Sequence, residues 1–83
     1  MEYKVLIKLF VPEVDEAYEM YIPVNKYVGE IAILLTDVVK DLTKVFPERK
    51  NANLCNRITG QIYQKDYLIR QTDIRNGTEL VLF

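Results

Sequence analysis

Apolar and polar residues alternate along the first two segments of the chain, a pattern typical of β-strands. Apolar residues occupy the odd positions from Tyr3 to Val11, whereas Lys4 and Lys8 stand at even positions. Alternation resumes from Ala17 to Pro23, which places three apolar residues on one face: Tyr18, Met20 and Ile22. Between the two runs, Pro12 to Glu16 supplies a proline and three acids, which do not continue a strand. The sequence therefore predicts a β-hairpin.

The spacing then changes to steps of three and four, which indicates an amphipathic helix. Asn25 or Tyr27 is the candidate N-cap, and Glu30 lies in the first turn, where the helix dipole favours an anion. Pro47 disfavours helical geometry in the residue before it, so the predicted helix runs from Val28 to Phe46. The apolar positions of its stripe are Val28, Ile31, Ala32, Leu35, Val38, Val39, Leu42 and Val45.

The second half of the chain contains shorter segments. Glu48 to Asn53 is predicted to be a polar connector, followed by a strand from Leu54 to Thr59. The Thr59-Gly60 pair predicts a tight turn into a short fourth strand that ends at Tyr63. Next comes an irregular stretch with four apolar residues that we expect to be buried: Tyr67, Leu68, Ile69 and Ile74.

Asn76-Gly77 predicts a turn that tolerates positive φ, and Thr78 to Phe83 alternates as a last strand. The order is thus hairpin, long helix and a return to the sheet. Such an order builds a two-layer α+β domain, and the handedness of crossover connections leaves the β-grasp as the most economical topology. We therefore predict a single β-grasp domain over residues 1–83, with a mixed sheet of four to five strands and one helix across one face.

Composition excludes several classes of function. The chain has 83 residues, a net charge of −1, one cysteine and no histidine. These values disfavour nucleic-acid binding driven by charge, and within this chain they exclude Cys/His zinc sites and histidine-dependent catalysis. The predicted helix carries too many charges to span a membrane. We expect a binding protein that is no enzyme, takes no cofactor and neither inserts into membranes nor binds nucleic acid.

Two features suggest chemistry only weakly. Cys55 is a potential nucleophile, but no histidine is present to lower its pKa, which favours a buried or edge-strand filler. The acidic cluster at Glu13, Asp15, Glu16 and Glu19 lacks the spacing of a calcium loop, so a solvated loop is the simpler interpretation.

The charge is unevenly distributed along the chain, because residues 1–37 carry −4 and residues 38–83 carry +3. That asymmetry either steers a partner or serves solubility alone.

The outer face of the predicted sheet is the candidate binding surface. If the odd positions of the first strand face the helix, then Leu6, Lys8 and Phe10 point outward, beside Val81 and Phe83 of the last strand. A contiguous apolar strip on a surface indicates a contact site, although isolated exposed apolar residues are common.

The chain resembles ubiquitin-like proteins over essentially its whole length, from Tyr3 to Phe83, and most strongly in its second half. The resemblance rests on the order and spacing of Ile58-Thr59-Gly60-Gln61, Tyr63, Ile69, Thr72-Asp73-Ile74, Asn76-Gly77 and Leu80-Val81-Leu82. In size, and in the phrase Ile22-Pro23-Val24 before the helix, the chain is most similar to the bacterial YukD/EsaB-type ubiquitin-like proteins. That family accompanies type VII (ESX-like) secretion systems.

The resemblance implies a non-conjugated adaptor that docks to secretion-system components in the cytoplasm, as a monomer or weak homodimer. Conjugation and sulfur transfer need a terminal Gly-Gly tail, whereas the sequence ends at Phe83. The centre of the surface by which ubiquitin is recognised falls on Arg57. Arg57 is therefore a sixth candidate partner-binding residue, but ordinary ubiquitin receptors are not expected to bind. The alternatives are a modifier or sulfur carrier whose tail is absent from this chain, and a homodimeric structural module.

Overall fold

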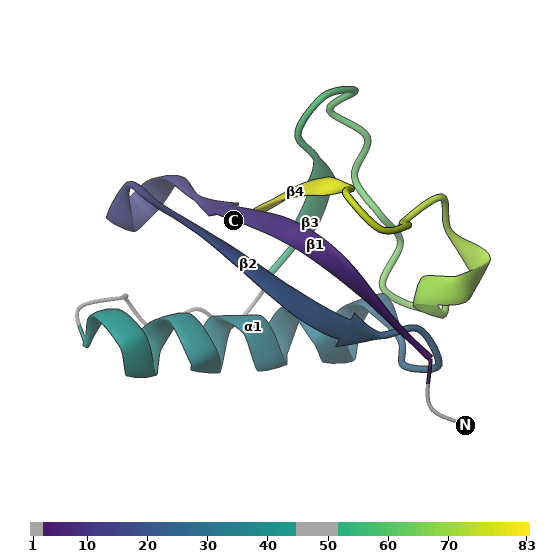
Figure 1. Ribbon diagram of the computed structural model, residues 1–83, viewed down its shortest axis with the longest axis horizontal. Coiled ribbons are helices and arrows are strands. Elements are labelled where there is room, and N and C mark those ends of the chain that lie inside the picture. The colour runs from purple at the N-terminus through teal and green to yellow at the C-terminus, as the bar shows by residue number, and fades with distance from the viewer. Residues whose placement is uncertain (1–2, 45–51) are drawn as a thin grey trace.

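The computed structural model describes residues 3–44 and 52–83 of the chain. In this part four strands form one mixed sheet in the order β2-β1-β4-β3, and helix α1 lies across one face (Figure 1). Strand β1 is antiparallel to β2 and parallel to β4, while β3 is antiparallel to β4. The predicted β-grasp fold is therefore confirmed. The element bounds are β1 Lys4–Val11, β2 Glu16–Pro23, α1 Val28–Thr43, β3 Leu54–Asn56 and β4 Glu79–Leu82.

The β1–β2 hairpin forms as the alternation predicted. A 3-10 helix at Pro12–Val14 reverses the chain, and Asp15 adopts a left-handed conformation with φ of 53°. The strands pair over their full length, with Ile7 opposite Met20 and Val5 opposite Ile22. Odd positions of β1 and even positions of β2 consequently share the face that α1 covers.

Helix α1 begins where the sequence allowed and ends earlier than predicted. Tyr27, rather than Asn25, is the N-cap, and its backbone N–H donates to the Glu30 Oε1 carboxylate oxygen at 3.2 Å. The helix ends at Thr43 because Lys44 adopts a left-handed conformation with φ of 60°. The predicted end at Phe46 is therefore wrong by three residues. Val45, Phe46 and Pro47 lie outside the described residues, as does most of the predicted 48–53 connector.

The predicted stripe of α1 is buried along most of its length but not at its end. Leu42 is 60% exposed, although its position on the helix wheel predicted burial. In Figure 1 the start of β2 lies well away from the C-terminal end of α1, the part of the helix to which Leu42 belongs. Thr36 is buried instead, and it satisfies its hydroxyl by donating to the Ala32 carbonyl at 2.8 Å.

The third strand ends earlier than predicted, and its backbone pairing begins earlier, at Asn53. Strand β3 stops at Asn56, whose side-chain Oδ1 accepts from the backbone N–H groups of Ile58 and Thr59 and so starts the turn. At the other end, the predicted polar connector is partly wrong: Ala52 is buried, and Asn53 exchanges two backbone hydrogen bonds with Phe83.

The predicted fourth strand reduces to a single bridge between Cys55 and Ile62. Tyr63 follows it and points into the core, with only 4% of its surface exposed. Its hydroxyl donates to Asp73 Oδ1 at 2.7 Å and accepts from Asn56 Nδ2 at 3.1 Å. This partly buried network ties the segment after β3 to the segment before β4.

The irregular stretch before β4 is buried only in part. A 3-10 helix at Ile69–Gln71 places Ile69 in the core, and Ile74 is buried as predicted. Tyr67 was expected to be buried, but its side chain is 46% exposed. Its contribution to the fold is its backbone carbonyl, which accepts from the Val28 N–H at the start of α1. Gly77 has φ of 88°, which confirms the predicted turn into β4.

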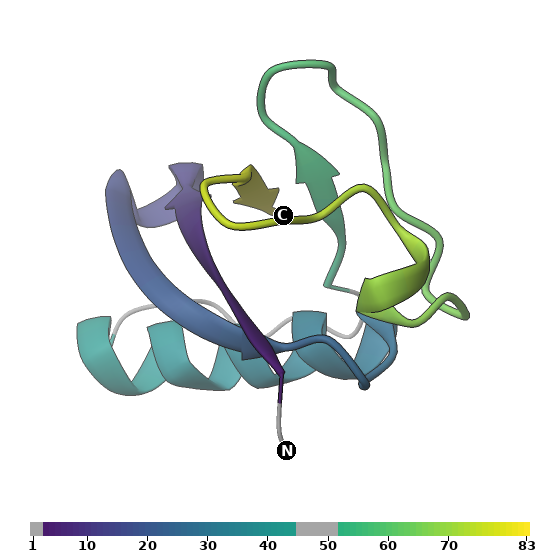
Figure 2. The same cartoon turned by 45° about the vertical axis from the view of Figure 1, so that its right-hand side comes forward.

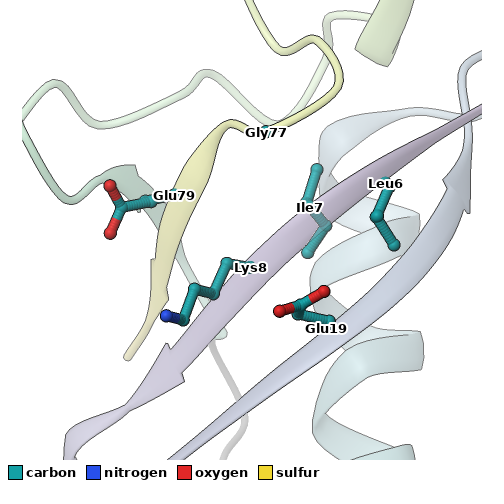
Figure 3. Close-up of a pocket in the computed structure, with 6 residues that line it drawn as sticks. All are labelled: Leu6, Ile7, Lys8, Glu19, Gly77 and Glu79. Carbon is teal, nitrogen blue, oxygen red and sulfur yellow. The ribbon is translucent and has the colours of Figure 1, made fainter.

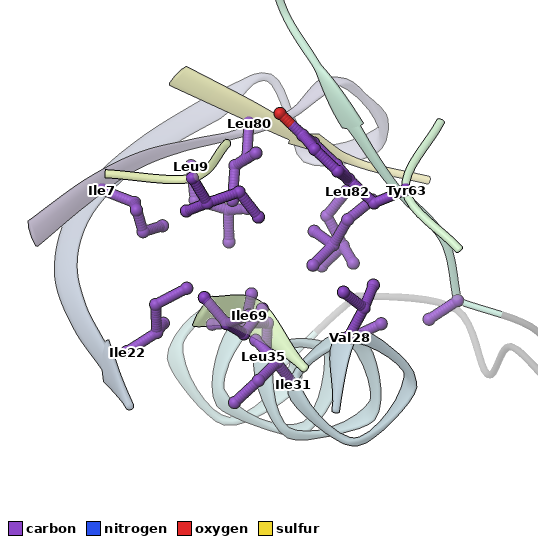
Figure 4. Packing of buried hydrophobic residues seen from close by; sticks show 14 of the residues in the cluster. Ile7, Leu9, Ile22, Val28, Ile31, Leu35, Tyr63, Ile69, Leu80 and Leu82 are labelled. Carbon is purple, nitrogen blue, oxygen red and sulfur yellow. The ribbon is translucent and has the colours of Figure 1, made fainter. Parts of the chain in front are cut away.

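One apolar cluster holds these elements together (Figure 4). Strands β1 and β4 supply residues that are at most 1% exposed, and α1 packs against them from the opposite side. The hydrophobic stabilisation of the fold therefore lies on the inner face of the sheet, which leaves the outer face for other roles. The labelled members of the cluster are Ile7, Leu9, Ile22, Val28, Ile31, Leu35, Tyr63, Ile69, Leu80 and Leu82.

Candidate interaction surface

A row of alternating charges crosses the outer face of the sheet. Lys8 in the central strand β1 stands opposite Glu19 in β2 and Glu79 in β4. Figure 3 shows Lys8 between these two carboxylate-bearing side chains. The row continues to Arg57, whose guanidinium Nη1 lies 3.0 Å from Glu79 Oε1. Opposite charges facing each other across strands stabilise the pairing modestly and make the surface polar along this line.

An apolar row runs beside the charged one. Phe10 stands opposite Ala17 in β2 and Val81 in β4, and Val81 stands opposite Cys55 in β3. Phe10, Val81 and Cys55 are each partly buried. The outer face thus combines one line of charge with one line of apolar side chains, each crossing the sheet from edge to edge.

Cations cover the ring of Phe10. The Arg57 guanidinium carbon lies 4.2 Å from the ring centroid, and Lys8 Nζ lies 5.4 Å from it. A cation over an aromatic face is attracted by the ring quadrupole, and the same placement shields the ring from water. Phe10 is therefore an apolar side chain on the outer face whose ring is partly covered by two cationic side chains.

Two hollows flank this centre. One, of about 290 Å³, lies between Leu6, Lys8, Glu19 and Glu79 (Figure 3). The other, of about 400 Å³, is lined by Phe10, Val11, Pro12, Asp15, Glu16, Ala17, Arg57 and Val81. The second hollow has an apolar floor, with Arg57 and the carboxylates of the hairpin turn around it. The apolar floor can bury an apolar side chain of a partner protein, and the charged residues around it can fix the orientation of that partner.

The structure brings five of the six predicted binding residues together. Leu6, Lys8, Phe10, Arg57 and Val81 all line the two hollows. Phe83 lines neither, because it continues β4 past the apolar row to the end of the sheet, where its backbone pairs with Asn53. The binding role of these residues stays a prediction.

Sequence patterns missed several residues of this surface. Ala17, Glu19 and Glu79 join it through strand register, which single-strand alternation does not reveal. Cys55 also faces this side, beside Val81. Burial raises the pKa of the Cys55 thiol, which keeps it protonated and weakens it as a nucleophile. Asp15 and Glu16 border the larger hollow, so part of the acidic loop belongs to the same surface.

The described residues contain neither a candidate metal site nor a candidate membrane-spanning helix. Across residues 3–44 and 52–83, no group of three or more Asp, Glu, Cys or His side chains is placed to hold a metal ion. In the same part of the chain, no helix is both long and apolar enough to cross a bilayer.

No protein-family model and no curated protein sequence matches the chain, but solved structures share its fold. The ubiquitin-like domain of EccD5 from Mycobacterium xenopi has a TM-score of 0.83 over 98% of this chain and 93% of that one, at 14% identity. The chain has a ubiquitin-like fold. A chain of a toluene 4-monooxygenase HD complex has a TM-score of 0.82 over 96% of both chains, at 8% identity.

A further match places the fold inside a longer protein. A chain of the ESX-5 inner membrane complex has a TM-score of 0.82 over 96% of this chain, at 16% identity, but the match spans only 20% of that chain. At identities this low, the three structures establish the fold and leave the biological role open.

Proposed function

We propose that this ubiquitin-like protein is a non-conjugated adaptor that docks to a protein partner through the outer face of its sheet. The observation that carries the proposal is the assembly of Leu6, Lys8, Phe10, Arg57 and Val81 around two hollows. Side chains of this kind have no packing role in the helix-covered core. A partner would bury the partly exposed Phe10 ring and Val81, while the charged row would set its orientation.

The proposed setting is the cytoplasmic side of a type VII (ESX-like) secretion system, where the protein serves as an accessory or regulatory component. Two observations support this setting. The fold matches the EccD5 ubiquitin-like domain over nearly the whole of both chains, and it matches a segment of a chain in the ESX-5 inner membrane complex. The sequence resemblance to YukD/EsaB-type proteins, carried by the size of the chain and by Ile22-Pro23-Val24 before the helix, supports the same setting.

The secretion role is tested by deleting the gene in its host and measuring export of a WXG-type substrate. We expect export to fall, and to be restored by the parent chain but not by Leu6→Glu or Val81→Glu. A buried unpaired charge at an interface anchor commonly costs more than about 2 kcal/mol of binding free energy. Unchanged export after deletion would contradict the secretion role.

Matched variants separate docking from folding. Ile33→Glu adds the same charge on the opposite side of the molecule, at a side chain that is 63% exposed, and it should restore export fully. Neutralising Glu13, Asp15 and Glu16 tests the part of the acidic loop that borders the larger hollow, and it should lower export less than Leu6→Glu or Val81→Glu, because charges at the rim of an interface contribute little. Circular dichroism checks that every variant is folded. Restoration by folded Leu6→Glu and Val81→Glu would overturn the outer-face site, and failure of the loop variant alone would move the site to the hairpin turn.

The modifier alternative is tested separately. The backbone N–H and carbonyl of Phe83 both form hydrogen bonds with Asn53, so Phe83 is held in the sheet and a reactive tail would have to extend beyond it. Intact-mass measurement of the protein purified from its host shows whether residues ending in Gly-Gly follow Phe83. Such a tail, or a covalent adduct on another protein, would replace the adaptor proposal with a modifier.

A further inference from the structure

The charges on the outer face alternate in sign from one edge of the sheet to the other. Along the strand order β2-β1-β4-β3, the row consists of Glu19, Lys8, Glu79 and, directly after β3, Arg57. The Arg57 backbone N–H donates to the Glu79 carbonyl at 2.9 Å, which continues the β3–β4 pairing by one residue. A row of negative, positive, negative and positive charge becomes its own complement when its direction is reversed.

A two-fold axis reverses this row when two copies of the chain place their outer faces together. If the axis lies parallel to the strands, between β1 and β4, Lys8 faces Glu79 of the second copy and Glu19 faces its Arg57. Every charge of the row then meets an opposite charge, and each pairing occurs twice by symmetry. An axis across the strands would instead place Lys8 on Lys8 and Glu19 on Glu19, which is unfavourable. The charge pattern therefore fits a second copy in one orientation.

The apolar row fits the same axis. Phe10 faces Val81 of the second copy next to the axis, whereas Ala17 faces Cys55 of the second copy at the edges of the sheet. The larger apolar side chains thus meet at the centre of the interface and the smaller ones at its margins. Two sheets commonly pack face to face about 10 Å apart with their strands within about 30° of each other, which is the arrangement that this axis produces.

A hollow lies opposite the next outward residue of β1. The Gly77 N–H donates to the Leu6 carbonyl at 2.8 Å, so these two residues are neighbours where the chain leads into β4. A Cβ atom at Gly77 would meet no atom beyond its chain neighbours within 4 Å, and the hollow beside it has a volume of about 290 Å³. The axis directs Leu6 of each copy toward Gly77 of the other, where open space can receive the side chain.

The area of the outer face sets the strength of such a contact. Eight residues of β1 at about 3.3 Å each and four strands at about 4.8 Å each give a footprint of at most roughly 500 Å². Stable specific interfaces bury about 800 Å² per copy, so the dimer is weak and exchanges with the monomer. We propose that the outer face binds a second copy of this chain about a two-fold axis parallel to β1 and β4. This proposal rests on the proposed function, because the second copy occupies the same docking surface, for which another protein must then compete.

Sedimentation equilibrium of the purified chain, from micromolar to millimolar concentration, measures self-association. We expect a monomer–dimer equilibrium without larger assemblies, because a two-fold interface is closed. Two-dimensional amide NMR over the same concentrations identifies the interface. Shifts that depend on concentration should centre on Lys8, Phe10, Glu79 and Val81, while the exposed Ile33 of α1 stays unchanged.

Exchanged charges test the orientation of the two copies. Lys8→Glu and Glu79→Lys should each weaken their own dimer at least about tenfold, a difference of about 1.4 kcal/mol, because like charges then face each other across the axis. An equimolar mixture of the two variants should form a heterodimer of nearly the parent's strength, since opposite charges face each other again. Lys8→Glu mixed with the parent chain should stay weaker than that mixture.

A matched control separates the position of the charge from its sign. Lys26→Glu makes the same change at an exposed side chain in the loop between β2 and α1, and it should dimerise as the parent does. Circular dichroism checks that every variant is folded. A parent chain that stays monomeric at millimolar concentration would overturn the proposal. So would shifts centred on α1, or a mixture of the exchanged variants no stronger than either variant alone.

The export assay keeps the dimer and the adaptor role distinguishable. If folded Leu6→Glu fails to restore export while the parent stays monomeric, the docking role stands and the dimer is wrong. If the parent dimerises with the expected charge dependence while Leu6→Glu restores export, the dimer stands and the adaptor site is wrong.

Discussion

The two faces of the sheet use similar residue types for opposite purposes. On the inner face, Ile7, Leu9, Leu80 and Leu82 are at most 1% exposed and pack against α1. On the outer face, the neighbouring residues Leu6, Phe10 and Val81 are only partly buried, and Phe10 is covered by cations from Lys8 and Arg57. Apolar character alone therefore does not distinguish a core residue from a surface anchor. What distinguishes them is whether another element of the same chain covers the side chain.

The sharpest way to break this comparison is a pair of adjacent substitutions in β1. Leu9→Ala should lower the free energy of unfolding by about 2–5 kcal/mol, because it leaves a cavity in the core. Phe10→Ala should cost about 1 kcal/mol, since it removes a partly exposed ring and its cation contacts. Urea denaturation of both variants measures the difference. Equal losses would show that the outer face contributes to stability as the inner face does.

The helix repeats the comparison on the opposite layer. Leu35 is 4% exposed, so Leu35→Ala should cost about 2–4 kcal/mol of unfolding free energy. Val38 is only partly buried, so Val38→Ala should cost about 1 kcal/mol. Denaturation midpoints check both values. Parent-like midpoints for Leu35→Ala would contradict the packing of the helix on the sheet.

A smaller effect concerns pH and the hydrogen bonds of the Tyr63 hydroxyl. Burial, together with the hydrogen bond to Asp73, raises the pKa of Tyr63 to about 12. The unfolded chain ionises this hydroxyl near pH 10, where the folded chain keeps it protonated. The stabilisation from Tyr63 is therefore complete below about pH 10 and is lost as pH rises toward 12.

Tyr63→Phe supplies the control for that titration. The variant should be less stable than the parent by about 1 kcal/mol at neutral pH, because Asp73 and Asn56 lose a partner. The difference in unfolding free energy between parent and variant should shrink between about pH 10 and 12. Denaturation at a series of alkaline pH values measures this difference. A difference that stays constant with pH would show that ionisation of the Tyr63 hydroxyl is not coupled to folding.

The smallest expected effect is that of the outer-face ion pair. Arg57 and Glu79 have side chains that are 47% and 32% exposed, and exposed pairs contribute at most about 1 kcal/mol. A double-mutant cycle with Arg57→Ala and Glu79→Gln should return a coupling energy within that limit, reduced further at high salt. A coupling energy well above it would mean that the charged row stabilises the fold rather than serving a partner.

Local periodicity was sufficient to predict the hairpin, the helix and the last strand. Alternation in β1 assigned Leu9 and Phe10 to opposite faces, and steps of three and four assigned Leu35 to the sheet. The Asn76-Gly77 pair marked a turn that requires positive φ. These features depend on neighbours in sequence, because strand and helix geometry determine which side chains share a face. The grouping of Leu6, Lys8, Phe10 and Val81 follows from the same rule.

Tertiary structure decided which of those faces is covered. Leu42 has the same helical phase as Leu35, yet Leu42 is 60% exposed and Leu35 only 4%, so the phase along the helix does not by itself decide burial. The cover of Arg57 over Phe10 joins two segments far apart in sequence. Periodicity along one element identifies its apolar side, but burial and contact depend on which other element reaches that side. For this protein, the strand order β2-β1-β4-β3 and the angle of α1 across it supplied that information.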